Sequence, residues 1–142
     1  MNRRSTEGFT LIEIMIVVII LAILAAAVIP RLTGRTEQAK EARAKADIET
    51  LSLSLDLYSI DNGFFPSTSQ GLPALRSAPS APPVPNNWRG PYLKKNLPND
   101  PWGHPYKYVA PGVHNKEDYD LSSFGPDGAE GNEDDVRNWE AQ

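Results

Sequence analysis

Residues 9–29 read FTLIEIMIVVIILAILAAAVI and contain one charged side chain, Glu13. As an α-helix rising about 1.5 Å per residue, this stretch extends roughly 31 Å, which is the thickness of the hydrocarbon core of a bilayer. Arg3 and Arg4 precede it, and basic residues favour the cytoplasmic side. We therefore predict a transmembrane helix over residues 9–30, followed by a periplasmic or extracellular part.

A cleaved secretory signal peptide is the alternative at this end of the chain. Such a signal needs an apolar run of only about 7 to 15 residues and a small-residue cleavage site, and the alanines at 25–27 keep this interpretation open. The longer run favours the membrane helix. So does the acid near its start, because a carboxylate in lipid is costly unless a cation pairs with it.

The cation for Glu13 has to come from outside the apolar run, which contains no base. An α-amino group freed by a cut before Phe9 is protonated at neutral pH, since its ordinary pKa is about 8. An amine on the same straight helix is poorly placed to reach Glu13. Pairing between neighbouring copies is therefore favoured, which predicts an assembly.

The motif GFTLIE, residues 8–13, with basic residues before it and the apolar run after it, resembles the leader junction of type IV pilins and of type II secretion pseudopilins. The resemblance implies that a prepilin peptidase removes residues 1–8 by cutting between Gly8 and Phe9, and that it methylates the new amine. It also implies that Glu13 recruits and neutralises the N-terminus of an incoming subunit.

Pro30 is expected to kink the helix or melt it locally, because proline removes a backbone donor and clashes with the preceding turn. A membrane helix that simply ends at the interface is an equally good interpretation, and the resemblance implies a stretch that unwinds in a filament. An amphipathic continuation is predicted over residues 31–63, ending at Asn62-Gly63. Its buried stripe should be formed by Ala44, Ile48, Leu51, Leu55 and Tyr58, and a second strip of Leu53, Leu57 and Ile60 should be covered as well.

Residues 64–142 are expected to form a globular head. Ser67 and Gln70 match a capping box for a short helix through about Arg76, and the five prolines of residues 77–91 predict a surface loop. Short runs at 106–109 and 119–124 favour an antiparallel sheet. The predicted fold class is α+β, with one long N-terminal helix packed on a small antiparallel sheet.

The segment DPWGHPY, residues 100–106, resembles the DPWGNPY motif of the major pseudopilins of type II secretion, with His104 in place of the usual Asn. The prolines and the tryptophan are explained by packing alone, so the motif indicates a subfamily and no chemistry. With this motif the resemblance covers nearly the whole chain and implies a type IV pilin-like fold.

Composition narrows the function. The chain has 142 residues and no cysteine, which is the size of one domain and excludes thiolate catalysis and thiolate metal sites. Nine acidic residues and one base, Arg137, lie within residues 117–142. Without a basic stripe, we expect no nucleic-acid partner. His104 and His114 are interpreted as surface residues, and the absence of catalytic motifs predicts that the protein is not an enzyme.

The acidic C-terminal loop, residues 124–135, alternates glycines with carboxylates. Such a loop suits calcium, which takes six to eight oxygen ligands in irregular geometry, but a merely solvated acidic loop fits the residues equally well. The resemblance implies calcium, with Asp127 and Asp134 as side-chain ligands. It adds main-chain oxygens of Phe124 and Asn132, and we include Asp135 as a further ligand.

The resemblance implies a structural subunit of the type II secretion pseudopilus, a helical homopolymer that pushes folded periplasmic proteins through the outer-membrane channel. Its implied partners are minor pseudopilins, prepilin peptidase, the inner-membrane assembly platform and, before assembly, membrane lipid. The implied location is the bacterial inner membrane, as a single-pass protein with a periplasmic head. The alternatives are a type IV pilin, disfavoured by the missing cysteine pair, and a membrane-anchored enzyme or calcium-dependent binding module.

Overall fold

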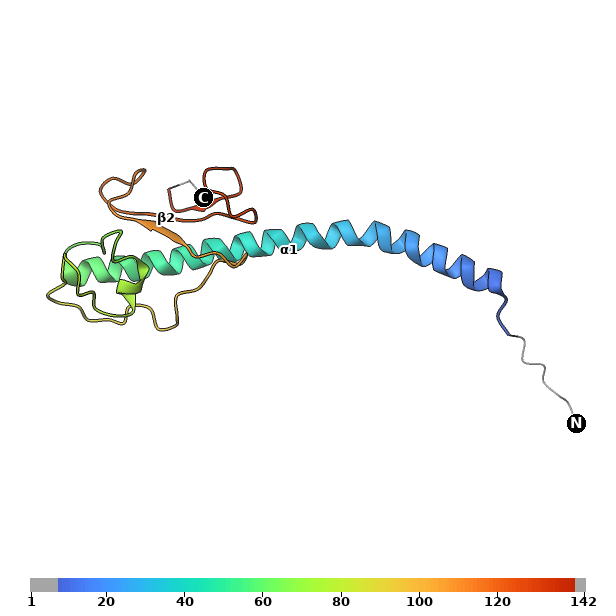
Figure 1. The fold of residues 1–142 in the computed structure, drawn as a ribbon, viewed down its shortest axis with the longest axis horizontal. Helices are drawn as coiled ribbons and strands as arrows, with labels where there is room; N and C mark the ends of the chain where they lie inside the picture. The colour runs from blue at the N-terminus through green and yellow to red at the C-terminus, as the bar shows by residue number, and fades with distance from the viewer. Residues whose placement is uncertain (1–7, 140–142) are drawn as a thin grey trace, which may run out of the picture. The chain divides into compact units, whose positions relative to one another are not determined.

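The computed structural model describes residues 8–139, except for the side chains of residues 27–33. The chain divides into two compact units, Met1–Gln38 and Ala39–Gln142. One helix, α1 (Leu11–Asn62), contributes residues to both units (Figure 1). The other elements all belong to the second unit and are η1 (Leu72–Leu75), β1 (Lys107–Val109), β2 (Asp120–Ser123) and β3 (Val136–Arg137).

Both ends of α1 have capping residues. At the start, the Glu13 carboxylate accepts hydrogen bonds from the Thr10 amide at 2.8 Å and the Thr10 hydroxyl at 3.0 Å. The Thr10 hydroxyl in turn accepts a bond of 3.3 Å from the Glu13 amide, which completes a capping box. At the predicted end, Gly63 has a φ of 81° and donates its N–H to the Ser59 carbonyl at 2.7 Å. Glycine adopts this left-handed conformation without a Cβ clash.

The local melting expected at Pro30 is not observed, because α1 continues through this position, and the kink stays a prediction. Proline fixes φ near −65°, which the α-helix also uses, so one proline removes a hydrogen bond without necessarily ending a long helix. The unwinding implied for a filament stays a prediction.

Within the part of the chain that the structure describes, no helix combines the length and the apolar character that a membrane span requires. The span predicted over residues 9–30 includes positions 27–30, which lie outside the described side chains, and it stays a prediction.

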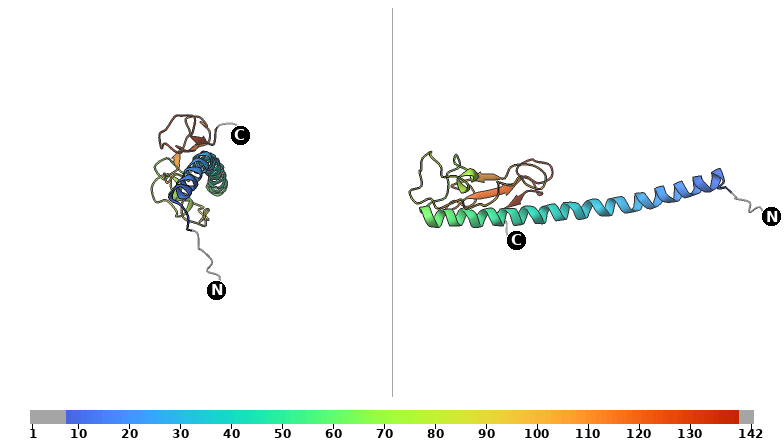
Figure 2. Two further views of the ribbon diagram at one scale, coloured as in Figure 1. Left: turned by 90° about the vertical axis from the view of Figure 1, so that its right-hand side faces the viewer. Right: turned by 90° about the horizontal axis from the view of Figure 1, so that it is seen from below.

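The predicted stripe of α1 forms one side of the hydrophobic core. Ala44, Leu55 and Tyr58 are fully buried, and Ile48 and Leu51 are nearly so. They cluster with buried residues of the sheet, which lies beside residues 39–62 of α1 (Figure 2). Because fully burying a large aliphatic side chain stabilises a fold by about 1.5–3 kcal/mol, this stripe is a main attachment between helix and sheet.

The second predicted strip is exposed, which corrects the expectation that it is covered. Leu53, Leu57 and Ile60 are 61%, 54% and 76% exposed. At 100° per residue, positions 53, 57 and 60 fall on the side of the helix roughly opposite the buried stripe. The head packs on one face of α1 only, so periodicity identified two apolar strips but not which of them the chain covers.

The sheet has the order β1-β2-β3 and is antiparallel throughout. β1 and β2 lie within the two predicted strand runs, and β3 was not predicted because it is only two residues long. Asn138 extends the pairing beyond β3. The Asn138 side-chain oxygen accepts a hydrogen bond of 2.9 Å from the Leu121 backbone N–H, and the Asn138 backbone N–H donates to the Leu121 carbonyl at 3.0 Å.

The segment after α1 is tighter than predicted. The capping-box bonds are present, since the Ser67 amide donates to the Gln70 side-chain oxygen at 3.0 Å and the Gln70 amide donates to the Ser67 hydroxyl at 3.3 Å. The helix expected through about Arg76 is instead the short 3-10 helix η1. Gly71, with a φ of 59°, takes the backbone out of the helical region before η1 starts.

Leu55→Ala is expected to lower the free energy of unfolding by about 2–5 kcal/mol, because truncating a fully buried leucine leaves a cavity. Leu57→Ala is the matched control on the same helix and should change it by less than about 0.5 kcal/mol, since Leu57 is exposed. Guanidinium unfolding of the purified full chain in detergent, followed by tryptophan fluorescence, measures both. Equal losses would contradict the one-sided packing of α1.

Candidate functional site

The C-terminal loop, residues 124–135, connects two neighbouring strands. β2 ends at Ser123, which pairs with Val136 at the start of β3, so the sheet holds the two ends of the loop together. Gly125 has a φ of 64°, and a Cβ added there would lie 2.4 Å from the Asp134 carbonyl oxygen and 3.0 Å from its carboxylate. This close approach requires glycine and places Asp134 against the residue that follows Phe124.

Two other predicted ligands meet on the exposed side of the loop. The Asn132 side-chain amide donates to one carboxylate oxygen of Asp127 at 2.6 Å, and the Ala129 amide donates to the other at 2.8 Å. Neither bond involves a charged donor. The Asp127 carboxylate is therefore stabilised by amides within its own loop.

Asp135 is the buried acid of the loop, with a side chain only 2% exposed. Its Oδ2 accepts bonds of 2.8 Å from the Gly131 amide and from Arg137 Nη2. The same Arg137 nitrogen donates to the Asn132 carbonyl at 2.6 Å. The Arg137 guanidinium thus contacts two predicted calcium ligands, Asn132, which the resemblance implies, and Asp135, which we added to the set.

The predicted ligands of the loop are carboxylate, amide and carbonyl oxygens, which are the ligand types that calcium prefers. Asn132 Oδ1 and Asp135 Oδ1 are also buried without a hydrogen-bond partner, and unsatisfied buried acceptors are costly. The described residues do not, however, gather three or more acidic or histidine side chains into a metal-binding group. The loop therefore supplies suitable oxygens that are held in separate clusters.

The Asp100–Tyr106 motif anchors the start of this loop. Asp100 Oδ1 accepts bonds from the amides of Trp102 at 3.1 Å and His104 at 2.7 Å, which fixes the turn. Asp100 Oδ2 accepts the Ser123 hydroxyl at 2.6 Å, and that hydroxyl accepts the Gly125 amide at 3.3 Å. The motif therefore does more than pack, which corrects the interpretation from the sequence. An aspartate opening a Pro- and Gly-rich turn was the signal for this role.

His104 borders the loop from the same turn. A Cβ added to Gly128 would lie 3.0 Å from the His104 ring, so the imidazole lies directly against the loop backbone. Its side chain is 40% exposed, and its Nδ1 is 3.7 Å from the Asp100 carboxylate. The histidine interpreted as a plain surface residue is thus part of the support for the loop.

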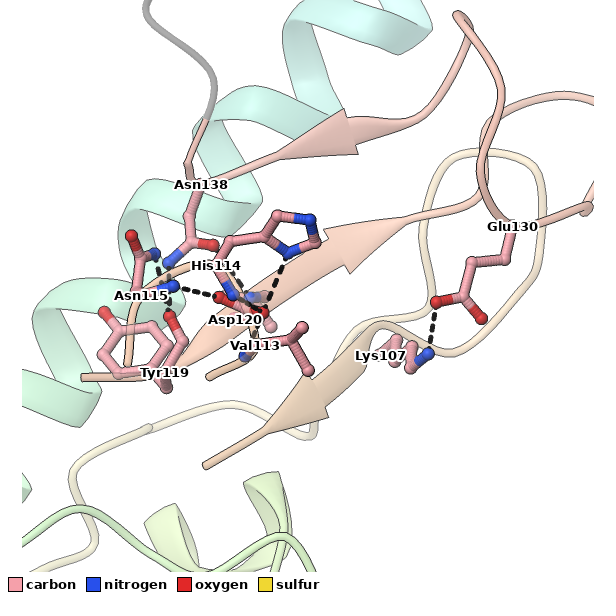
Figure 3. A network of polar contacts seen from close by, with 9 residues as sticks. Lys107, Val113, His114, Asn115, Tyr119, Asp120, Glu130 and Asn138 are labelled. Atoms are coloured by element: carbon pink, nitrogen blue, oxygen red, sulfur yellow. Dashed lines mark hydrogen bonds and ion pairs between the residues drawn. The ribbon is translucent and has the colours of Figure 1, made fainter. Parts of the chain in front are cut away.

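A second polar network surrounds Asp120 at the start of β2 (Figure 3). Its carboxylate accepts three amide bonds, from Val113 at 2.7 Å and from His114 and Asn115 at 2.9 Å each, and His114 Nδ1 lies 3.1 Å away. The His114 ring stacks on Trp139 with centroids 4.3 Å apart. No sequence signal pointed to this network, because the amides come from an irregular loop.

Burial raises the pKa of the Asp120 carboxyl, but the hydrogen bonds from Asn115, His114 and Val113 together lower it by more. The pKa therefore lies below its ordinary value. A carboxyl with a lowered pKa in the folded state stabilises the fold above its ordinary pKa and loses that contribution as the pH falls through the folded-state pKa.

At the N-terminal end, the expected cleavage position lies just before α1. Phe9 is 84% exposed, and the Glu13 carboxylate is bonded to Thr10, as described above. The leader residues 1–7 lie outside the described residues. The Thr10–Glu13 capping box was not predicted, although the spacing Thr-x-x-Glu before an apolar run is its usual signal.

Comparison with known proteins identifies the family. A family model described as type II secretion system (T2SS), protein G matches residues 31–139. The chain belongs to the type II secretion system protein G family. A second model, the prokaryotic N-terminal methylation motif, matches residues 3–29, which include the predicted leader junction and the apolar run.

Curated relatives cover nearly the whole chain. The type II secretion system core protein G of Pseudomonas aeruginosa is 53% identical over 144 residues, 99% of this chain and 99% of that protein. The Escherichia coli K12 core protein G is 48% identical over 96% of this chain and 94% of its own length.

A solved structure gives the same family. The crystal structure of the major pseudopilin from the type 2 secretion system of enterohaemorrhagic Escherichia coli matches with a TM-score of 0.68 and 40% identity, covering 76% of this chain and 89% of that chain. The matches confirm the predicted pilin-like α+β fold and favour the secretion pseudopilin over the type IV pilin.

Asp120→Asn is expected to lower the free energy of unfolding by roughly 2 kcal/mol at neutral pH, because the three amides then lose a charged acceptor. The difference in free energy of unfolding between this variant and the unaltered chain should stay constant as the pH falls to the ordinary carboxyl pKa of about 3.9. It should shrink at lower pH. Denaturant unfolding from pH 7 to pH 2 measures it, with the exposed Asp118→Asn as control. A difference that persists undiminished at pH 2 would contradict this role of Asp120.

Proposed function

We propose that the chain polymerises into the helical pseudopilus of a type II secretion system and that this filament pushes folded periplasmic proteins through the outer-membrane channel. The observation that carries the proposal is the exposed apolar surface of α1. Thirteen large apolar side chains between residues 9 and 24 are about half exposed or more, and so is the strip of Leu53, Leu57 and Ile60. Surfaces of this kind mark contacts with membranes or proteins.

Before assembly, we place residues 9–30 in the inner membrane, with the N-terminus in the cytoplasm and the head in the periplasm. The support is the apolar run together with Arg3 and Arg4 before it. After assembly, the same side chains pack against those of other copies. The same apolar surface therefore contacts lipid before assembly and the helices of other copies in the filament.

Glu13 has a different partner in each state of this scheme. In the free chain its carboxylate is held by the amide and hydroxyl of Thr10, which moderates the cost of an acid in lipid. A cut after Gly8 leaves Thr10 in place and creates an amine at Phe9. In the filament, that amine on one copy pairs with Glu13 of the next.

The proposed partners follow from this cycle. They are prepilin peptidase for the cut and the methylation, the assembly platform and minor pseudopilins for filament growth, and other copies of the chain for the filament itself. The protein acts mechanically in this scheme and catalyses no reaction.

Glu13→Gln is expected to abolish filament assembly and secretion, while membrane insertion and trimming continue. Glutamine still completes a capping box with Thr10, so this change removes the charge and keeps the helix start. Glu49→Gln, on the exposed surface of the same helix, is the matched control. Quantifying sheared filaments and secreted cargo in cells that carry each variant measures the effect. Normal filaments from Glu13→Gln would contradict the proposed pairing.

We also propose that the 124–135 loop binds calcium. Asp127 and Asp134, with main-chain oxygens of Phe124 and Asn132 and with Asp135, would hold the ion. When bound, calcium neutralises clustered carboxylates and couples its binding to loop order. The support is the oxygen-only donor set and the two buried unpartnered oxygens of Asn132 and Asp135.

Calcium at 100 times its dissociation constant should stabilise the unaltered chain by about 2.7 kcal/mol. Asp134→Ala should remove most of that gain, and the exposed neighbour Glu133→Ala should keep it. Thermal melts of the purified full chain, with calcium titrated against a chelator, measure the gain. The calcium loop would be refuted if the unaltered chain melted at the same temperature with and without calcium.

A further inference from the structure

Arg137 occupies the inner side of the C-terminal loop. It lies in β3 opposite Ser122, so the sheet fixes its backbone position. Its side chain is only 18% exposed, and its guanidinium carbon lies 5.9 Å from the centre of the Trp139 ring. Nη2 donates to the Asn132 carbonyl at 2.6 Å and to Asp135 Oδ2 at 2.8 Å.

These two acceptors are also two of the oxygens assigned to calcium. Bonds from a guanidinium to a carboxylate are among the strong hydrogen bonds of proteins. A second cation at the same oxygens would have to displace the guanidinium or tolerate its charge nearby. The loop therefore holds its own cation at the place where a metal is expected.

We propose that Arg137 is an internal cation that competes with calcium for Asp135 and for the Asn132 carbonyl. This inference rests on the proposed calcium loop. Without metal, Arg137 neutralises the buried Asp135 and keeps the end of the loop folded. With metal, Arg137 leaves these oxygens, and the ion takes its place.

Competition lowers the apparent affinity of the loop. When a binding-competent state is only partly populated, the apparent dissociation constant rises by the inverse of its population. A loop held by Arg137 nine-tenths of the time would bind calcium about 10-fold more weakly than a loop without it. Arg137 thus sets the calcium concentration at which the loop changes its cation.

The chain provides a matched control in Lys107, a second cation that contacts the same loop. The ammonium group of Lys107 in β1 donates a hydrogen bond to the Glu130 carboxylate (Figure 3). Neither residue belongs to the proposed ligand set. Neutralising Lys107 changes the net charge by the same amount as neutralising Arg137, but it leaves Asp135 and Asn132 untouched.

The test is isothermal titration of calcium into the purified full chain in detergent, for the unaltered protein, Arg137→Gln and Lys107→Gln. Arg137→Gln should bind calcium about 10-fold more tightly and should melt at a lower temperature without metal. Lys107→Gln should stay within about 2-fold of the unaltered protein. If Arg137→Gln folds poorly without metal, Arg137→Lys keeps the charge beside Asp135 and should give an intermediate affinity.

The outcomes separate the two claims. If the unaltered chain binds calcium, and Arg137→Gln and Arg137→Lys bind it no more tightly than the unaltered chain, the proposed competition is overturned. The proposal that the loop binds calcium would then still hold. An equal gain in Arg137→Gln and Lys107→Gln would assign the effect to net charge and also overturn the competition. No binding by any of the proteins would refute the calcium loop, and this inference with it.

Discussion

The constraint on which the rest depends is that α1 has more apolar surface than its own chain covers. The head buries the stripe from Ala44 to Tyr58 and leaves Leu53, Leu57 and Ile60 exposed. The side chains between residues 11 and 24 are exposed in the same way. Because exposing apolar surface to water is costly, such a helix requires lipid or other copies around it. The proposed filament would cover this apolar surface with the helices of other copies.

The carboxylates of the head are stabilised in three different ways. Asp120 is held by backbone amides, Asp135 by the guanidinium of Arg137, and Asp127 by the amides of its own loop. Asp100 performs a fourth task by tying the 100–106 turn to Ser123 and thereby to the loop. The described carboxylates of the acidic C-terminus are thus bonded separately, and Asp135 Oδ2 becomes available to another cation only when its bond to Arg137 breaks.

The sequence predicted what depends on local spacing and missed what depends on tertiary partners. The stripe of α1, its stop at Gly63 and the Ser67–Gln70 box follow from periodicity and capping chemistry. The exposure of the second strip could not be predicted in this way, because periodicity does not show how many faces of the helix the head covers. β3 is too short to give a pattern, and the contacts of Asp120 and Arg137 come from loops that only the folded chain brings together. The Thr10–Glu13 box was available from spacing.

The most direct measurement is the structure of the assembled filament at a resolution that shows side chains. The account predicts that Leu53, Leu57 and Ile60 are covered by neighbouring copies and that the Glu13 carboxylate lies within hydrogen-bond distance of the Phe9 amine of another copy. A filament in which that strip faces solvent and Glu13 still bonds only to its own Thr10 would contradict it.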